Sequence, residues 1–106
     1  MRESDFLDWL IDLARLYRWR CAHFRPARIV KNGVESWRTA VSADGRGFPD
    51  VLLIREGDII VAELKSEKGK LSPEQEEWLQ EFARNPIVRA YVWRPADRDL
   101  IEEILK

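Results

Sequence analysis

Apolar residues recur every three or four positions in the first part of the chain, along residues 4–17. They are Phe6, Leu7, Leu10, Ile11, Leu13, Ala14 and Tyr17. This spacing predicts an amphipathic helix, because residues three and four apart share one helical face. Ser4 or Asp5 could supply its N-terminal cap, since short polar side chains accept hydrogen bonds from the first free N–H groups. Trp9 and Leu16 widen the apolar arc, which leaves a possible subunit contact.

A second helix begins at a clear start signal. Ser72 is suited to the N-cap, Pro73 to the first helical position, and Gln75 to the third, where it would complete a capping box. The apolar face that follows consists of Trp78, Leu79 and Phe82. Asn85-Pro86 ends this helix, and residues 96–105 predict a short terminal one.

Four stretches have the composition of β-strands: residues 19–24, 49–55, 58–65 and 87–93. Between the first two, residues 25–46 contain turn signals without a sustained period, and a small hairpin around Asn32-Gly33 is possible. The resulting order is α-β-β-β-α-β-α. We therefore expect one α/β domain over residues 1–106, with a mixed central β-sheet flanked by helices.

Strands 49–55 and 58–65 are separated by Glu56-Gly57, a dipeptide suited to a two-residue hairpin turn. With this turn, Arg55 pairs with Asp58, and Asp50 lies opposite Glu63. The register predicts that the Cβ atoms of these two carboxylates are roughly 4.5–5.5 Å apart. Alternation puts Lys65 on their face, and both faces of the hairpin are otherwise apolar, as in central strands covered on both sides.

Two opposed carboxylates at the end of an apolar hairpin need compensation, because they repel each other and lose hydration. A shared proton, the neighbouring Lys65 or a divalent cation could provide it. Mg²⁺ prefers oxygen ligands such as these carboxylates. The purely structural alternative is an ion pair at a sheet edge, with Lys65 bridging Asp50 and Glu63.

Composition is that of a globular protein, with 45% hydrophobic and 35% charged residues in 106. The net charge of −1 hides a segregation, since residues 15–46 hold eight basic residues against two acidic ones. Such a segment can bind nucleic acid or be solvated surface. No apolar run approaches the roughly 18 residues of a membrane span, and the single cysteine, Cys21, excludes a disulfide within the chain. A cytoplasmic location is the simplest expectation.

The sequence resembles a known family at these residues. Gly47-Phe48-Pro49-Asp50 followed by Glu63-Leu64-Lys65 looks like the PD-(D/E)XK nuclease signature. With the following helix and YVWRP, the chain resembles the VRR-NUC branch, in particular the small stand-alone proteins of phages and bacteria. The resemblance runs from Glu3 through the last helix and implies a restriction-endonuclease-like core. The family often has Gly where this chain has Arg18, which leaves the local turn after the first helix in doubt.

The resemblance also implies roles for individual residues. Asp50 and Glu63 would bind Mg²⁺ or Mn²⁺ together with the Leu64 backbone carbonyl, and Lys65 would be the catalytic lysine. Gln75 matches a family glutamine, although its role could be the capping box alone or both. Glu3 matches an acidic residue of the first helix and is a further candidate metal ligand. Alternatively, Glu3 only places a negative charge at the helix N-terminus, where it interacts favourably with the helix dipole.

The implied activity is metal-dependent, structure-selective cleavage of DNA, without an organic cofactor. The resemblance favours a homodimer that resolves Holliday junctions, in the cytoplasm of a bacterium or of a phage-infected host. Candidate DNA-binding residues are Arg25, Arg28, Lys31, Arg38, Arg46, Lys68 and Lys70. The alternatives are a flap or nicking nuclease, a restriction-like nuclease acting with a partner, and a non-catalytic DNA-binding module.

Overall fold

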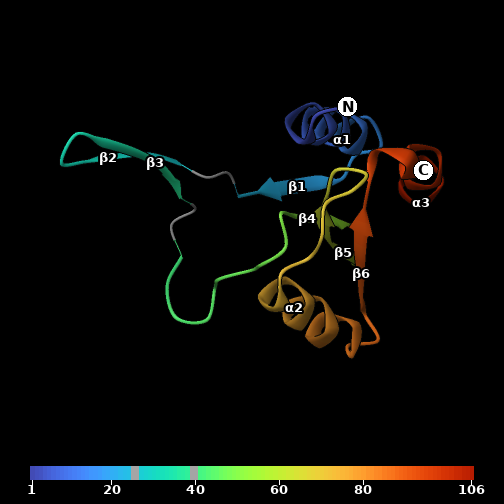
Figure 1. The fold of residues 1–106 in the computed structure, drawn as a ribbon. Helices are drawn as coiled ribbons and strands as arrows, with labels where there is room; N and C mark the ends of the chain where they lie inside the picture. The colour runs from blue at the N-terminus through green and yellow to red at the C-terminus, as the bar shows by residue number, and fades with distance from the viewer. Residues whose placement is uncertain (25–26, 39–40) are drawn as a thin grey trace.

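The fold alternates helices and strands along the chain (Figure 1). The computed structural model describes residues 1–24, 27–38 and 41–106; at 27–29 and 37–38 it describes the backbone alone. The elements are α1 (Glu3–Leu16), β1 (Arg20–His23), β2 (Ala27–Lys31), β3 (Val34–Arg38), β4 (Val51–Arg55), β5 (Asp58–Leu64), α2 (Pro73–Ala83), β6 (Val88–Trp93), the 3-10 turn η1 (Pro95–Asp97) and α3 (Arg98–Leu105).

The main sheet has four strands in the order β1-β4-β5-β6. Its β1–β4 and β4–β5 pairs are antiparallel and its β5–β6 pair is parallel, so the predicted mixed sheet is confirmed. In Figure 1, α1 and α3 lie on one side of this sheet and α2 on the other. Strands β2 and β3 form a separate hairpin, with the left-handed φ angles of 52° and 75° at Asn32 and Gly33 that a two-residue turn requires. No helix in the described ranges has the length and apolar character needed to cross a membrane.

The hairpin of β4 and β5 has the predicted register. Arg55 pairs with Asp58, and the ladder continues to the pair of Val51 and Ala62. Glu56 and Gly57 have φ angles of 50° and 88°, as expected when both turn residues are left-handed. Since the ladder stops one residue short of Asp50, this carboxylate leaves the end of β4 beside the C-terminal end of β5.

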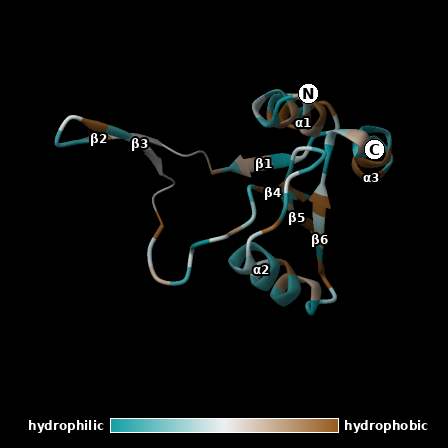
Figure 2. Cartoon of the chain, in the orientation of Figure 1, coloured by the Kyte–Doolittle hydropathy of each residue, from teal (hydrophilic) through white to brown (hydrophobic). Residues whose placement is uncertain are grey.

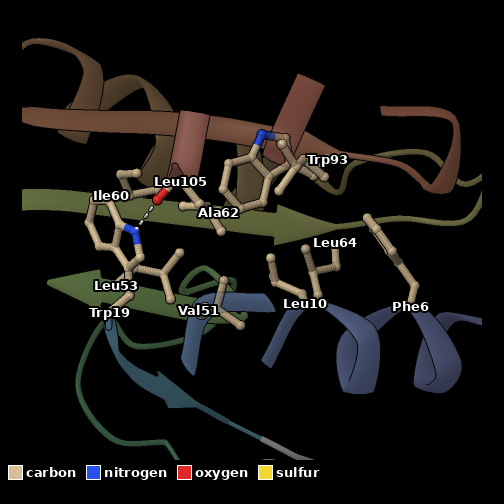
Figure 3. Close-up of a cluster of buried hydrophobic side chains, with 12 residues drawn as sticks. Phe6, Leu10, Trp19, Val51, Leu53, Ile60, Ala62, Leu64, Trp93 and Leu105 are labelled. Carbon is tan, nitrogen blue, oxygen red and sulfur yellow. Dashed lines mark hydrogen bonds between the residues drawn. The ribbon is translucent and has the colours of Figure 1, made fainter. Parts of the chain in front are cut away.

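The core lies between the sheet and the helices α1 and α3 (Figure 3). Val51, Leu53, Ile60, Ala62 and Leu64 point from the strands into this layer and meet Phe6, Leu10, Trp93, Ile101 and Leu105. The Trp19 indole closes one end and donates a hydrogen bond of 2.9 Å to the Leu105 carbonyl. This layer fixes β4 and β5 rigidly, because a packed interior tolerates little displacement.

The opposite face of the sheet is covered less completely. Val61 and Glu63 are buried beneath the α2 side, but Ile54 near the hairpin turn is 38% exposed. In α2 itself no side chain is fully buried, and in Figure 2 its ribbon is mostly hydrophilic. The predicted cover on both faces therefore holds at the Glu63 end of the hairpin and is incomplete at the turn end.

The two ends of α1 differ from what the sequence suggested. The helix begins at Glu3 with Arg2 as the N-cap residue and no side-chain cap, so the capping predicted for Ser4 or Asp5 is wrong. At the other end, Arg18 has a φ of 66°. The N–H of Arg18 bonds to the Arg15 carbonyl and that of Trp19 to the Ala14 carbonyl, which forms a Schellman-type end. Arg18 thus occupies a position that favours glycine.

Candidate active site

Asp50 is held at the entry to β4 by backbone contacts on both sides. Its Oδ2 accepts a hydrogen bond of 2.9 Å from the Leu64 N–H, at the end of β5. Its own carbonyl accepts one of 3.1 Å from the Phe24 N–H, just after β1. The preceding Pro49 is buried and lacks an N–H. Asp50 is therefore fixed between β1 and β5 at the start of the inner strand β4.

Glu63 is the one buried acidic residue among the residues that the structure describes, with a relative exposure of 2%. Its Oε1 accepts a hydrogen bond of 2.8 Å from the Gln75 amide and lies 3.8 Å from the Lys65 ammonium. No hydrogen-bond donor within the described ranges reaches its Oε2. A buried carboxylate oxygen without a donor is costly, so this atom calls for a ligand or a proton.

The electrostatics of Glu63 agree with this geometry. Burial raises the pKa of its carboxyl from an ordinary value of 4.5 to about 8, and charge repulsion from the adjacent Asp50 carboxyl contributes further. Lys65 opposes the rise but does not cancel it. In the absence of a cation, Glu63 is thus expected to hold a proton near neutral pH.

Gln75 serves the helix and the site together. The Ser72 hydroxyl accepts a hydrogen bond of 3.2 Å from the Gln75 N–H, and the Gln75 Oε1 accepts one of 2.8 Å from the Ser72 N–H. The predicted capping box is therefore confirmed. Since the box uses only the oxygen of the side-chain amide, its nitrogen remains free to donate to Glu63.

Gly47 allows the loop before Asp50 to lie against the first turn of α2. Its φ is +83°, and a Cβ added there would come within 2.6–2.8 Å of backbone atoms of Glu74 and Gln75. The Trp78 indole secures the same loop by donating to the Asp44 and Arg46 carbonyls, at 3.0 and 3.1 Å. Glycine in the GFPD motif thus brings α2, and with it Gln75, close to Asp50.

Arg94 is a residue of the site region to which sequence reasoning gave no role. Its Nη1 donates to the Ser66 and Gly69 carbonyls at 2.6 and 2.7 Å, and so holds the loop that follows Lys65. Its position follows from the assembled sheet, in which β5 and β6 are parallel and Trp93 pairs with Leu64. The residue after Trp93 therefore had to lie beside Lys65.

The other predicted site residues are distributed as follows. Leu64 is buried at the end of β5, whereas Glu3 is exposed at the first position of α1. Within the described part of the chain, no third acidic, His or Cys side chain joins Asp50 and Glu63 in a cluster able to hold a metal. The structure thus does not gather Glu3 with the pair.

The candidate DNA-binding residues that the structure describes lie on the surface. Lys31, Arg46, Lys68 and Lys70 are exposed, and Arg46 also lies 4.0 Å from a Glu74 carboxylate oxygen. Arg25 and the side chains of Arg28 and Arg38 lie outside the described residues. Arg46 precedes Asp50 by four residues, and Lys68 and Lys70 belong to the segment that follows Lys65.

Comparison with known proteins agrees with this arrangement. The family model of the VRR-NUC domain matches residues 18–96, which include the carboxylate pair, Lys65, Gln75 and Arg94. The chain belongs to the VRR-NUC family. No curated protein and no solved structure gave a significant match.

A VRR-NUC domain is a nuclease domain of the PD-(D/E)XK type, so this chain is a nuclease that acts on DNA. The mixed sheet between α1, α3 and α2 is compatible with the restriction-endonuclease-like fold. Domains of this type generally use divalent metals. In this VRR-NUC domain the carboxylate pair lies at the C-terminal end of β5, next to the parallel strand β6.

Proposed function

We propose that this VRR-NUC domain is a Mg²⁺- or Mn²⁺-dependent endonuclease that hydrolyses phosphodiester bonds of DNA between Asp50, Glu63 and Lys65. The observation that carries the proposal is the Glu63 Oε2 atom, buried beside the Asp50 carboxyl and without a hydrogen-bond donor in the described ranges. A carboxylate pair of this kind has no evident use in a protein that only binds DNA, because it repels phosphate.

The residues present fit a hard divalent cation. Asp50 and Glu63 would bind it through carboxylate oxygens, with the Leu64 carbonyl as a further ligand. Once bound, such an ion lowers the pKa of a water molecule and stabilises negative charge on the scissile phosphate. The hydrogen bonds from Gln75 to Glu63 and from Leu64 to Asp50 support this role, since they orient the two carboxylates before any ligand arrives.

Lys65 is the group best suited to hold the attacking water or a phosphate oxygen. Its side chain is 16% exposed, so it borders solvent, and its ammonium is 3.8 Å from the Glu63 carboxylate. The Arg94 contacts to Ser66 and Gly69 restrain the loop behind it. A lysine restrained in this way can act without a large reorganisation during reaction.

The substrate is DNA with a branched or otherwise irregular structure, and its backbone would contact the exposed basic residues. Binding of this kind depends on phosphate charge and DNA shape more than on base sequence. A homodimer cutting four-way junctions is the form that we favour, because two-fold symmetry supplies two sites for two strands. The exposure of Leu16, 69% at the end of α1, supports such an association by leaving apolar surface free.

The test is a panel of labelled DNAs that share one sequence: linear duplex, nicked duplex, flap and four-way junction, each with Mg²⁺, Mn²⁺ or EDTA. We expect metal-dependent cuts that are fastest on the junction, and a molecular mass of two chains by analytical ultracentrifugation. A monomer that cuts linear duplex as fast as the junction would overturn the dimeric resolvase proposal. Absence of cleavage on every DNA would overturn the endonuclease proposal.

A further inference from the structure

A cavity of about 430 Å³ opens directly beside the carboxylate pair. Asp50 and Gln75 belong to its lining, so it is continuous with the site proposed for hydrolysis. Phe24, Val41 and Phe48 form its apolar walls, and Ser42 adds a hydroxyl. A volume in this range with few polar groups is typical of a pocket that binds a small organic group.

The aromatic wall of the cavity is braced from behind. Phe24 is 47% exposed, and its ring forms an edge-to-face pair with the Phe48 ring, with centroids 5.5 Å apart and planes at 88°. Phe48 in turn packs against Trp78 and Phe82 at 5.1 and 5.9 Å. The Phe24 backbone is itself bonded to the Asp50 carbonyl. Phe24 is therefore an exposed ring at a fixed position next to a candidate catalytic residue, and it is not needed to fill the core.

We propose that this cavity binds one unpaired nucleobase of the DNA substrate, stacked on Phe24, next to the scissile phosphate. The inference rests on the proposed function and names its substrate class. A phosphate held at Asp50 and Glu63 brings the bases of its own two nucleotides to this wall. Aromatic side chains bind bases by stacking with little regard to sequence, and a base inside an intact duplex cannot reach them. The cavity thus selects DNA that is single-stranded, flapped or unstacked at the cut.

The inference predicts a position-specific dependence on one base. A single abasic residue is moved step by step along the unpaired strand of a flap, and binding is measured by fluorescence anisotropy with Ca²⁺, which takes the same oxygen ligands. In the wild type, the abasic residue is expected to weaken binding about 5- to 150-fold at one position beside the cut, the range for loss of one stacked base. In Phe24→Ala the same residue should have no effect at that position.

Two further variants keep the test decisive. Phe24→Leu retains an apolar side chain and loses the ring, so it should resemble Phe24→Ala if stacking is the cause. Leu100→Ala removes a side chain with 58% exposure on α3, across the sheet, and should behave as wild type.

A flat abasic profile in a wild type that cuts DNA overturns the cavity inference alone. If Phe24→Ala is a monomer and keeps the wild-type abasic profile, the cavity is a contact with a second copy of the chain. That result also overturns the cavity inference. A wild type that binds with the predicted profile and never cuts overturns the proposed hydrolysis instead.

Discussion

Replacement of Glu63 by glutamine should stabilise the metal-free protein at alkaline pH. Glu63 is 2% exposed, and burial together with Asp50 raises the pKa of its carboxyl to about 8. Between about pH 4.5 and 8, the folded chain keeps this proton while the unfolded chain has lost it. Folded stability is therefore greatest below pH 4.5, as far as this group contributes, and falls as the pH rises through this window.

The magnitude follows from the linkage of proton binding to folding. One proton bound by the folded chain alone is worth about 1.4 kcal/mol for each pH unit. We therefore expect the free energy of unfolding in EDTA to fall by about 2 kcal/mol between pH 6 and pH 8 in the wild type. Glu63→Gln keeps the shape of the side chain and an acceptor for the Gln75 amide, but it has no proton to lose. Its curve should therefore lack this contribution.

The assay is urea unfolding followed by tryptophan fluorescence at several pH values in EDTA, for the wild type and Glu63→Gln in parallel. The difference between the two proteins isolates Glu63 from other groups that titrate. Mn²⁺ should then recover stability at pH 8 in the wild type and less so in the variant, because it binds the ionised carboxylate. Equal pH slopes for the two proteins would refute the reasoning that Glu63 is buried and protonated in the metal-free site.

Four other substitutions test the backbone geometry and the contacts that support the site. Gly47→Ala should lower the free energy of unfolding by about 2 kcal/mol or more, because the added methyl group clashes with α2. Gly57→Ala, at a similar φ of +88° but with open space around it, should lower it by about 1 kcal/mol. Urea unfolding of both variants measures the difference. Arg18→Gly should raise the melting temperature by a few degrees, since it relieves a left-handed residue; no rise in a thermal scan would contradict this. Arg94→Lys should slow single-turnover cleavage about 10-fold with DNA affinity unchanged, because the loop behind Lys65 loosens. A loss of DNA affinity as large as the loss of cleavage rate would argue against a positioning role.

The parts of the fold that the sequence predicted depend on local chemistry. The register of β4 and β5 followed from the Glu56-Gly57 turn, and the start of α2 followed from the Ser72 capping box. Because the turn fixes which residues oppose each other, the approach of Asp50 and Glu63 could also be predicted. The contact between Gln75 and Glu63 was within reach for the same reason, since the capping box and helical spacing determine where Gln75 points.

The remaining features depend on tertiary contacts without a local signature. The cap of α1 was wrong because the helix starts at Glu3, one residue before Ser4, and helix ends respond to packing beyond the first turn. Phe24 and Phe48 are far apart in sequence, yet their rings are in contact. The loop that carries Phe48 can lie against α2 only because Gly47 permits close approach. The roles of Arg94 and of the cavity therefore became visible only in the assembled fold.

The most direct test of the central claim is the single-turnover rate of DNA cleavage by Lys65→Ala with Mn²⁺, on the best substrate of the panel. Lys106→Ala, which replaces an exposed lysine at the end of α3 that is not among the candidate DNA-binding residues, is the matched control. If Lys65 holds the reacting water or phosphate beside Asp50 and Glu63, its loss should slow cleavage by about 100-fold or more with little change in DNA affinity, and the control should cleave as wild type. Cleavage by Lys65→Ala at the wild-type rate would contradict the claim that hydrolysis occurs at this site.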